Sequence, residues 1–106
     1  MAKKRYDTEF SIRLKMALYH TGIDWTSPQA VGTHFGRPRQ TTHQWLTGTI
    51  PDSRDELWLV EEKLKDTTAK WLITGKDTPK WASVLDPDKF RKAESQEILT
   101  TRRKRR

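Results

Sequence analysis

The sequence predicts an all-α domain, and three local patterns support this prediction. Apolar residues recur at helical spacing near the start of the chain, as at Phe10 and Leu14. Gly22 follows this periodic segment at the position where a left-handed residue would end a helix. Ser27-Pro28 is a start signal, because serine can cap a helix and proline fits its first turn. Together these patterns predict five helices and no strand in the first 75 residues.

The expected elements follow one another with short connections. Residues 1–8 are expected to form a basic N-terminal arm. A fourth helix is expected to be capped by Asp52 or Ser53, and a fifth by Thr67 or Thr68. Asp86-Pro87 is expected to start a last, sparsely apolar helix that ends near residue 101. The first three helices are predicted over residues 9–21, 28–35 and 38–47. The fourth has its apolar positions at Leu57, Val60 and Leu64, and the fifth runs from Thr67 or Thr68 through Ile73 and is ended by Gly75.

The connection between the second and third predicted helices is a tight turn. Gly36 can adopt the positive φ that a sharp turn needs, and Pro38 pushes Arg37 out of helical geometry. Gly32 lies inside the second helix, where glycine costs about 1 kcal/mol relative to alanine. We therefore expect a neighbouring helix to pass close to Gly32; a plain weak point in a short helix is the alternative.

Composition limits the classes of protein to which the chain can belong. A length of 106 residues suits one domain. A hydrophobic content of 33% and a mean hydropathy of −0.93 predict a small core, in which the tryptophans fill much of the space. The absence of cysteine excludes disulfides, zinc fingers and thiol catalysis. No signal peptide and no apolar run of about 18 residues is visible, so we expect a cytoplasmic protein.

The charge is distributed unevenly along the chain. The formal net charge is +7, of which residues 1–51 carry +4 and residues 52–101 carry −2. Residues 102–106 add five basic side chains in a row. A basic half that coincides with a polar helix favours attraction to the phosphates of a nucleic acid. A generally basic protein would not need this segregation.

The third predicted helix has two contrasting faces. Thr42, Trp45 and Leu46 share an apolar face, so Trp45 is expected in the core rather than stacked on a base. The opposite face carries arginine and glutamine side chains, whose donors and acceptors match the base edges in the DNA major groove. A solvated polar face is the alternative interpretation. The residues of this polar face are Arg39, Gln40, His43 and Gln44.

Over residues 9–75 the arrangement resembles the phage-repressor family of helix-turn-helix proteins, the lambda repressor and Cro-like domains of the xenobiotic-response-element type. The resemblance implies a five-helix DNA-binding domain that regulates transcription, most often as a repressor. The chain departs from the usual family pattern at Pro28, Gly32 and Pro38, and the loop before the second helix is longer. The resemblance is carried by Arg13-Leu14, Ala17, Val31, Phe35-Gly36, Trp45, Gly48 and the segment Trp71-Leu72-Ile73-Thr74-Gly75.

The resemblance and the chemistry of the side chains point to the same base-reading positions. Arg39 can donate two hydrogen bonds to guanine, and Gln40 and Gln44 can each bond bidentately to adenine. Thr41 and His43 flank these positions and could contact a base or a phosphate. For each candidate phosphate contact a plain surface role is the alternative. These candidates are Arg13, Ser27, Gln29, Arg37, Thr47 and Thr49.

The remaining residues give no sign of catalysis or of a cofactor. The three histidines lie on different segments without helical pairing, so no metal site is expected. No nucleophile motif or glycine-rich phosphate loop is present, so we do not expect an enzyme. Trp58 and Trp71 are expected in the core, whereas Trp25 and Trp81 could belong to the core or to a contact surface.

The C-terminal part is expected to assist binding. Residues 76–101 form an extension that either docks on the domain or pairs two copies as a dimerisation helix. Residues 102–106 are expected to be disordered and to attract phosphates non-specifically, with a merely solubilising end as the alternative. The expected partners are double-stranded DNA, a second copy of the chain and a protein that controls activity. An antitoxin or adaptor module and an RNA-associated basic protein remain the alternative functions.

Overall fold

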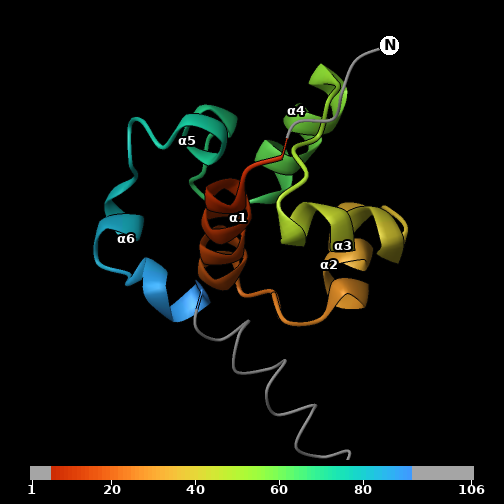
Figure 1. Ribbon diagram of the computed structural model, residues 1–106, viewed down its shortest axis with the longest axis horizontal. Coiled ribbons are helices and arrows are strands. Elements are labelled where there is room, and N and C mark those ends of the chain that lie inside the picture. The colour runs from red at the N-terminus through yellow and green to blue at the C-terminus, as the bar shows by residue number, and fades with distance from the viewer. Residues whose placement is uncertain (1–5, 92–106) are drawn as a thin grey trace, which may run out of the picture.

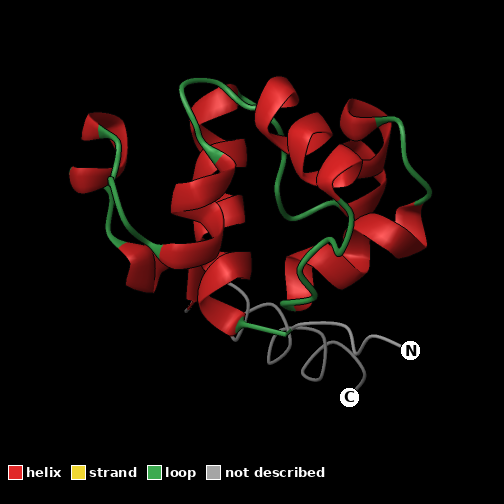
Figure 2. Cartoon of the chain, turned by 90° about the horizontal axis from the view of Figure 1, so that it is seen from above, coloured by secondary structure: helices red, strands yellow, loops and turns green. Residues whose placement is uncertain are grey.

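The described part of the chain is all-helical, as the sequence predicts. The computed structural model describes residues 6–91. Within that range no strand is formed, and loops connect the helices (Figure 2). A further helical segment covers residues 87–91. The named helices are α1 (Thr8–Thr21), α2 (Pro28–Phe35), α3 (Arg39–Thr47), α4 (Arg54–Lys63), α5 (Ala69–Thr74) and α6 (Lys80–Ser83).

Side chains cap most of these helices at the residues that the sequence indicates. The Ser27 hydroxyl accepts a hydrogen bond from the Ala30 amide, and Pro28 occupies the first position of α2. Of the alternatives left open for α4 and α5, Ser53 and Thr68 are the caps. Gly22 ends α1 with a φ of 96°, which confirms its predicted left-handed conformation.

The segment before α1 differs from the prediction. Tyr6 pairs with Thr49 in an isolated antiparallel bridge, and the Asp7 amide donates to the Gly48 carbonyl at 2.8 Å. The Asp7 carboxylate accepts a hydrogen bond from the Glu9 amide, so α1 begins at Thr8. The predicted free arm is therefore wrong for residues 6–8, because this segment is tied to the end of α3. Residues 1–5 lie outside the described range.

Helix α1 is the centre of the fold. It contacts α3 on one side and both α5 and α6 on the other (Figure 1). Its buried apolar stripe therefore forms the middle of one continuous core. The fully buried large side chains of this core are Phe10, Ile12, Leu14, Leu18, Val31, Phe35, Val60 and Leu72.

The tryptophans divide between core and surface differently from the prediction. Trp45 and Trp71 are each 3% exposed, which confirms that they belong to the core. Trp58 is 61% exposed, so its predicted place in the core is wrong. The reason lies in the geometry of α4: Val60 is fully buried, and a side chain two positions away on a helix points to the opposite side.

The first part of the C-terminal extension docks on the domain. Trp81 of α6 stacks on His20 at 4.3 Å between ring centroids and donates its indole N–H to the Asp66 carbonyl at 2.7 Å. The buried Phe90 ring lies 5.2 Å from the ring of Trp25. Of the two roles left open for the extension, residues 76–91 therefore take the docked one. The remainder of the predicted last helix, residues 92–101, and the basic tail lie outside the described residues.

Candidate nucleic-acid interface

The turn between α2 and α3 brings the two helices unusually close. Gly36 has a φ of 70° and ends α2, and the Arg37 amide donates to the Gly32 carbonyl at 2.9 Å. A Cβ atom on Gly32 would lie only 2.7 Å from the Arg37 carbonyl oxygen. The expectation that backbone passes close to Gly32 is therefore confirmed, and glycine is needed there because any side chain would collide with the turn.

The buried face of α3 fixes its rotation about its own axis. The Thr42 hydroxyl is buried and lies 3.0 Å from the Pro28 carbonyl oxygen and 3.0 Å from the Arg39 carbonyl oxygen. Trp45 packs edge-on against Phe35 of α2 with ring centroids 5.7 Å apart. Because this face is held by both a hydrogen bond and an aromatic contact, the opposite edge of α3 has a defined orientation.

That opposite edge consists of polar side chains that point to solvent. Arg39, Gln40 and His43 are exposed, and Thr41 and Gln44 are half-buried. Among the described residues none of these five side chains takes part in a hydrogen bond or ion pair, so none of them is engaged within that part of the chain. We call them the α3 edge. Arg39, Gln40, His43 and Gln44 share the polar face of α3, whereas Thr41 is two positions from Arg39 and lies beside the buried face.

The start of α3 leaves backbone groups available as well. Pro38 precedes the helix and provides no side-chain cap, as the sequence suggests. The first amides of an α-helix have no partner within the helix, and the helix dipole makes this end attractive to anions. A phosphate near the first turn of α3 would therefore satisfy amides that other helices of this chain satisfy with a serine or threonine.

The four uncharged candidates for phosphate contacts differ in exposure and in the contacts that they already make within the protein. Gln29 is exposed at the start of α2. Ser27 is occupied as the cap of α2, and the Thr47 hydroxyl donates to the Gln44 carbonyl at 2.9 Å. Thr49 follows α3 and pairs with Tyr6. Only Gln29 among these four has a fully solvent-facing side chain without an intramolecular role in the described part of the chain.

Arg37, a further phosphate candidate, is held by a carboxylate of α4. Its Nε and Nη2 atoms lie 2.8 Å and 2.6 Å from one oxygen of Glu56. This hydrogen bonding to Glu56 raises the pKa of Arg37. The guanidinium stays charged, but the adjacent carboxylate compensates much of its field at the start of α3.

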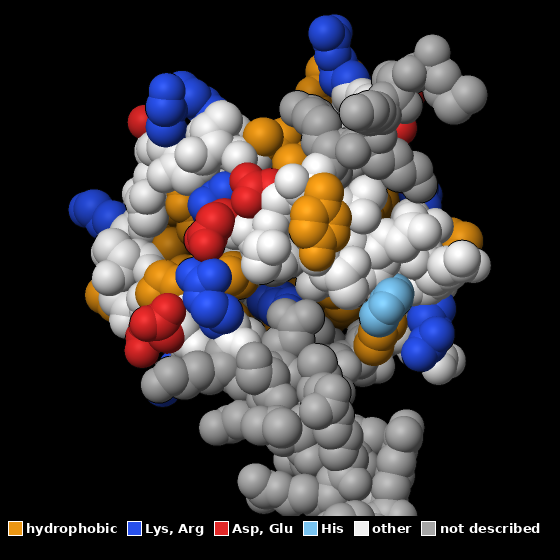
Figure 3. Space-filling view, viewed as in Figure 1, with side chains coloured by type: hydrophobic (Ala, Val, Ile, Leu, Met, Phe, Trp, Pro, Cys, Tyr) orange, Lys and Arg blue, Asp and Glu red, His pale blue; other side chains and the backbone are white. Residues whose placement is uncertain are grey.

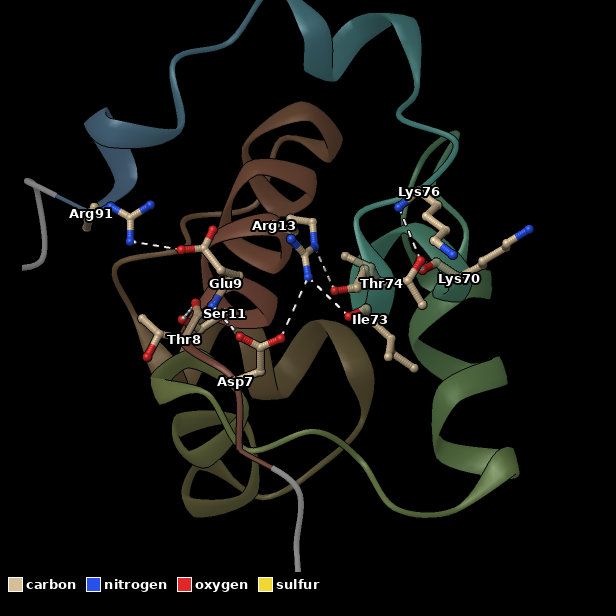
Figure 4. A network of polar contacts seen from close by, with 11 residues as sticks. Asp7, Thr8, Glu9, Ser11, Arg13, Lys70, Ile73, Thr74, Lys76 and Arg91 are labelled. Atoms are coloured by element: carbon tan, nitrogen blue, oxygen red, sulfur yellow. Dashed lines mark hydrogen bonds and ion pairs between the residues drawn. The ribbon is translucent and has the colours of Figure 1, made fainter.

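Arg13, the candidate phosphate contact on α1, has a structural task instead. Its Nε atom donates to the Leu72 carbonyl at 2.9 Å, and Nη2 donates to the Ile73 carbonyl at 3.1 Å. Figure 4 shows the guanidinium between the end of α5 and Asp7, whose carboxylate is 3.9 Å away. We therefore remove Arg13 from the set of phosphate contacts, because its donors hold the last carbonyls of α5.

Charges are mixed rather than gathered on the face seen in Figure 3. Acidic and basic side chains lie next to one another there, and no continuous basic area covers the described surface of this face. A broad cationic patch is therefore not what would attract a nucleic acid to this face. Recognition through this face would depend on the placement of individual donors.

The sequence analysis does not predict the exposure of two aromatic side chains, Tyr6 and Trp58. Tyr6 is 67% exposed, and its ring covers Gly48 at the end of α3, where a Cβ atom would lie 2.9 Å from it. Trp58 projects from α4. No sequence signal marks Tyr6, since its partner Thr49 is 43 residues away.

Within residues 6–91 no cluster of three potential metal ligands exists, and no helix is long and apolar enough to cross a membrane.

Comparison with known proteins leaves the family open. No protein-family model, curated protein or solved structure matches this chain. The resemblance to phage repressors therefore stays a prediction.

Proposed function

We propose that this chain binds double-stranded DNA in a sequence-specific way and regulates transcription, as a repressor of prophage or mobile-element type. The observation that carries the proposal is the α3 edge: polar side chains on one short helix, oriented by a buried opposite face and without hydrogen bonds or ion pairs to the described residues. Helix α3 would enter the major groove, and α2 would lie across its back. This arrangement corresponds to a helix-turn-helix unit.

The side chains of the α3 edge suit direct reading of base pairs. Arg39 offers a planar pair of donors for guanine O6 and N7, and Gln40 and Gln44 offer a donor and an acceptor for adenine. Each bidentate contact would contribute about 1–3 kcal/mol of discrimination between base pairs. The uncapped first turn of α3 and the exposed Gln29 would contact phosphates and set the register.

One domain of this size covers little DNA, so tight binding would need two copies. Two helix-turn-helix units bind half-sites about 34 Å apart, one turn of the duplex. The described residues include no helix that could cross a membrane. An action on chromosomal DNA would place the protein in the cytoplasm, at the nucleoid, where a protein partner could control it.

A mobility-shift titration on a pool of random duplexes at rising salt tests the proposal. Retention of a sequence preference in moderate salt supports it, because non-specific phosphate attraction weakens steeply with salt. The variants Arg39→Ala and Gln40→Ala should each weaken this preference at the base pairs that the side chain contacts, while leaving the protein folded. Thr33→Ala, at an exposed position on α2, is the matched control and should leave the preference unchanged.

Three other outcomes would refute the proposal. Binding that disappears only when residues 102–106 are deleted, and that favours RNA, would identify an RNA-associated basic protein. A protein that copurifies in stoichiometric amount, with no DNA preference, would identify an antitoxin or adaptor module. Equal affinity for all duplexes would leave only a non-specific DNA-binding protein.

A further inference from the structure

Helix α4 presents an unpartnered stripe on the side that faces away from the core. Arg54, Trp58 and Glu62 are spaced by four residues, so they lie one above the other on a single helical face. All three are exposed, and Trp58 is 61% exposed. Val60, on the opposite side of α4, is fully buried. We call these three residues the α4 stripe.

The two charges of the α4 stripe are poorly placed for an isolated helix. Arg54 is the first residue of α4, where the helix dipole disfavours a cation, and Glu62 lies one residue before the end, where it disfavours an anion. Arg54 lies over the Trp58 ring, 6.0 Å from its centroid. Glu62 has no hydrogen bond or ion pair among the described residues, whereas its neighbour Glu61 accepts from the Ala69 amide at 2.8 Å.

We propose that the α4 stripe is the contact by which two copies of this chain pair, with their α4 helices antiparallel about a two-fold axis at Trp58. Antiparallel pairing about that residue brings together positions equally far before and after it. Arg54 then lies opposite Glu62 of the partner subunit, and the same pair forms again on the other side of the axis. The two tryptophan rings meet at the centre, and the two helix dipoles oppose one another.

The rest of the structure favours a second copy as the occupant of this surface. The stripe is charge-complementary to itself only when reversed, which is the condition for a contact between identical subunits. The described part of the C-terminal extension is already docked on α1, where Trp81 stacks on His20 and Phe90 packs against Tyr19. A large aromatic residue at the centre of a polar rim is also typical of a protein interface.

The small area of the α4 stripe limits the affinity that we expect between two copies of the chain. A buried tryptophan removes about 150–250 Å² from water, whereas a standard interface covers about 800 Å² on each partner. We therefore expect pairing that depends on concentration rather than an obligate dimer. The inference does not require the proposed function, since it concerns the protein without DNA, but it would supply the two copies that the half-sites need.

Sedimentation velocity of the full chain without DNA, over a range of concentrations, tests the pairing. We expect a monomer–dimer equilibrium for the wild type and a monomer for Trp58→Ala at the same concentrations. Arg54→Glu and Glu62→Arg should each be monomeric, because each places like charges opposite one another. An equimolar mixture of these two variants should dimerise, since one chain then carries two acidic and the other two basic residues.

The mixture makes the test independent of folding defects in a single variant. Thermal unfolding followed by circular dichroism should show all three variants folded, because every substituted side chain is exposed. A wild type that stays monomeric well above micromolar concentration, a dimer that survives Trp58→Ala, or a mixture that stays monomeric would each overturn the proposal. Loss of DNA binding in Trp58→Ala without a change in oligomeric state would also overturn it, since the stripe would then contact DNA.

The α3 variants separate this inference from the proposed function. Gln40→Ala should remain a dimer while it loses sequence preference at one or two positions in each half-site. A wild-type protein that dimerises through α4 but has no affinity for DNA would refute the proposed function and leave the pairing intact.

Discussion

The α3 edge and the junction between α1 and α5 both contain an exposed or half-buried arginine, yet they differ in what those arginines can do. At the junction, Arg13 donates to two carbonyls at the end of α5 and lies beside Asp7. At the α3 edge, Arg39 is exposed and has no hydrogen bond or ion pair with the described residues. The polar groups of the junction satisfy one another, whereas those of the edge do not.

The difference shows that position in the fold decides whether a basic side chain is available to a ligand. Arg13 donates its hydrogen bonds to carbonyls at the end of α5, which would otherwise have no partners. Arg39 follows a proline that provides no cap, on a helix whose opposite face is buried. The following predictions separate residues that hold the fold from residues that are free to bind.

The largest expected effect concerns two tryptophans of opposite burial. Trp45→Ala should lower the free energy of unfolding by about 3–5 kcal/mol, because it removes a buried aromatic side chain that packs on Phe35. Trp58→Ala should change it by less than about 0.5 kcal/mol. Urea denaturation followed by circular dichroism, at a low protein concentration, measures both. Similar losses for the two variants would show that the division between core and surface is wrong.

The two arginines should differ in the same way. Arg13→Ala should cost about 1.5–3 kcal/mol of stability, since it removes charged donors from the carbonyls of Leu72 and Ile73. Arg39→Ala should leave stability within about 0.5 kcal/mol of the wild type and reduce only DNA discrimination. Denaturation and duplex binding are measured on both variants. An Arg13→Ala variant as stable as the wild type would show that Arg13 does not hold the end of α5, and the difference between Arg13 and Arg39 would disappear.

The close approach of the turn to α2 gives a third test. Gly32→Ala should destabilise the protein by about 1–3 kcal/mol, because the added Cβ would meet the Arg37 carbonyl at 2.7 Å. Thr33→Ala, one residue along on the exposed face of α2, is the control. A stabilising Gly32→Ala would mean that the gain in helix propensity outweighs the collision and that the turn can move.

The smallest effect concerns the charge that compensates Arg37. Glu56→Gln should release the Arg37 guanidinium and steepen the dependence of log K on log salt by about one unit, if Arg37 then contacts a phosphate. Asp77→Asn is the control, since it releases Lys70 from an ion pair of 3.0 Å on α5. Equal slopes for Glu56→Gln and the wild type would place Arg37 away from the DNA backbone.

Local chemistry explains which parts of the fold could be predicted from the sequence. The start of α2 at Ser27-Pro28 and the turn at Gly36 depend on the conformational preferences of the residues themselves. The two faces of α3 follow from helical spacing, with Thr42 and Trp45 on the buried side. These elements needed no knowledge of distant contacts.

The errors arose where the outcome depends on distant residues. The Arg13 guanidinium bonds to carbonyls 59 and 60 residues away, and backbone acceptors leave no mark in the sequence. Tyr6 is tied to Thr49, which lies far along the chain. Trp58 is exposed, contrary to the prediction, because the spacing of Val60 and Leu64 defines a buried face of α4 that excludes it.

The central claim is that the α3 edge reads base pairs, and selection of bound duplexes from a random pool tests it most directly. The account predicts that the wild type selects a motif with related halves. It also predicts that Gln40→Ala selects the same motif with the preference lost at one or two positions in each half. An identical motif from both proteins, or no motif from the wild type, would contradict the account.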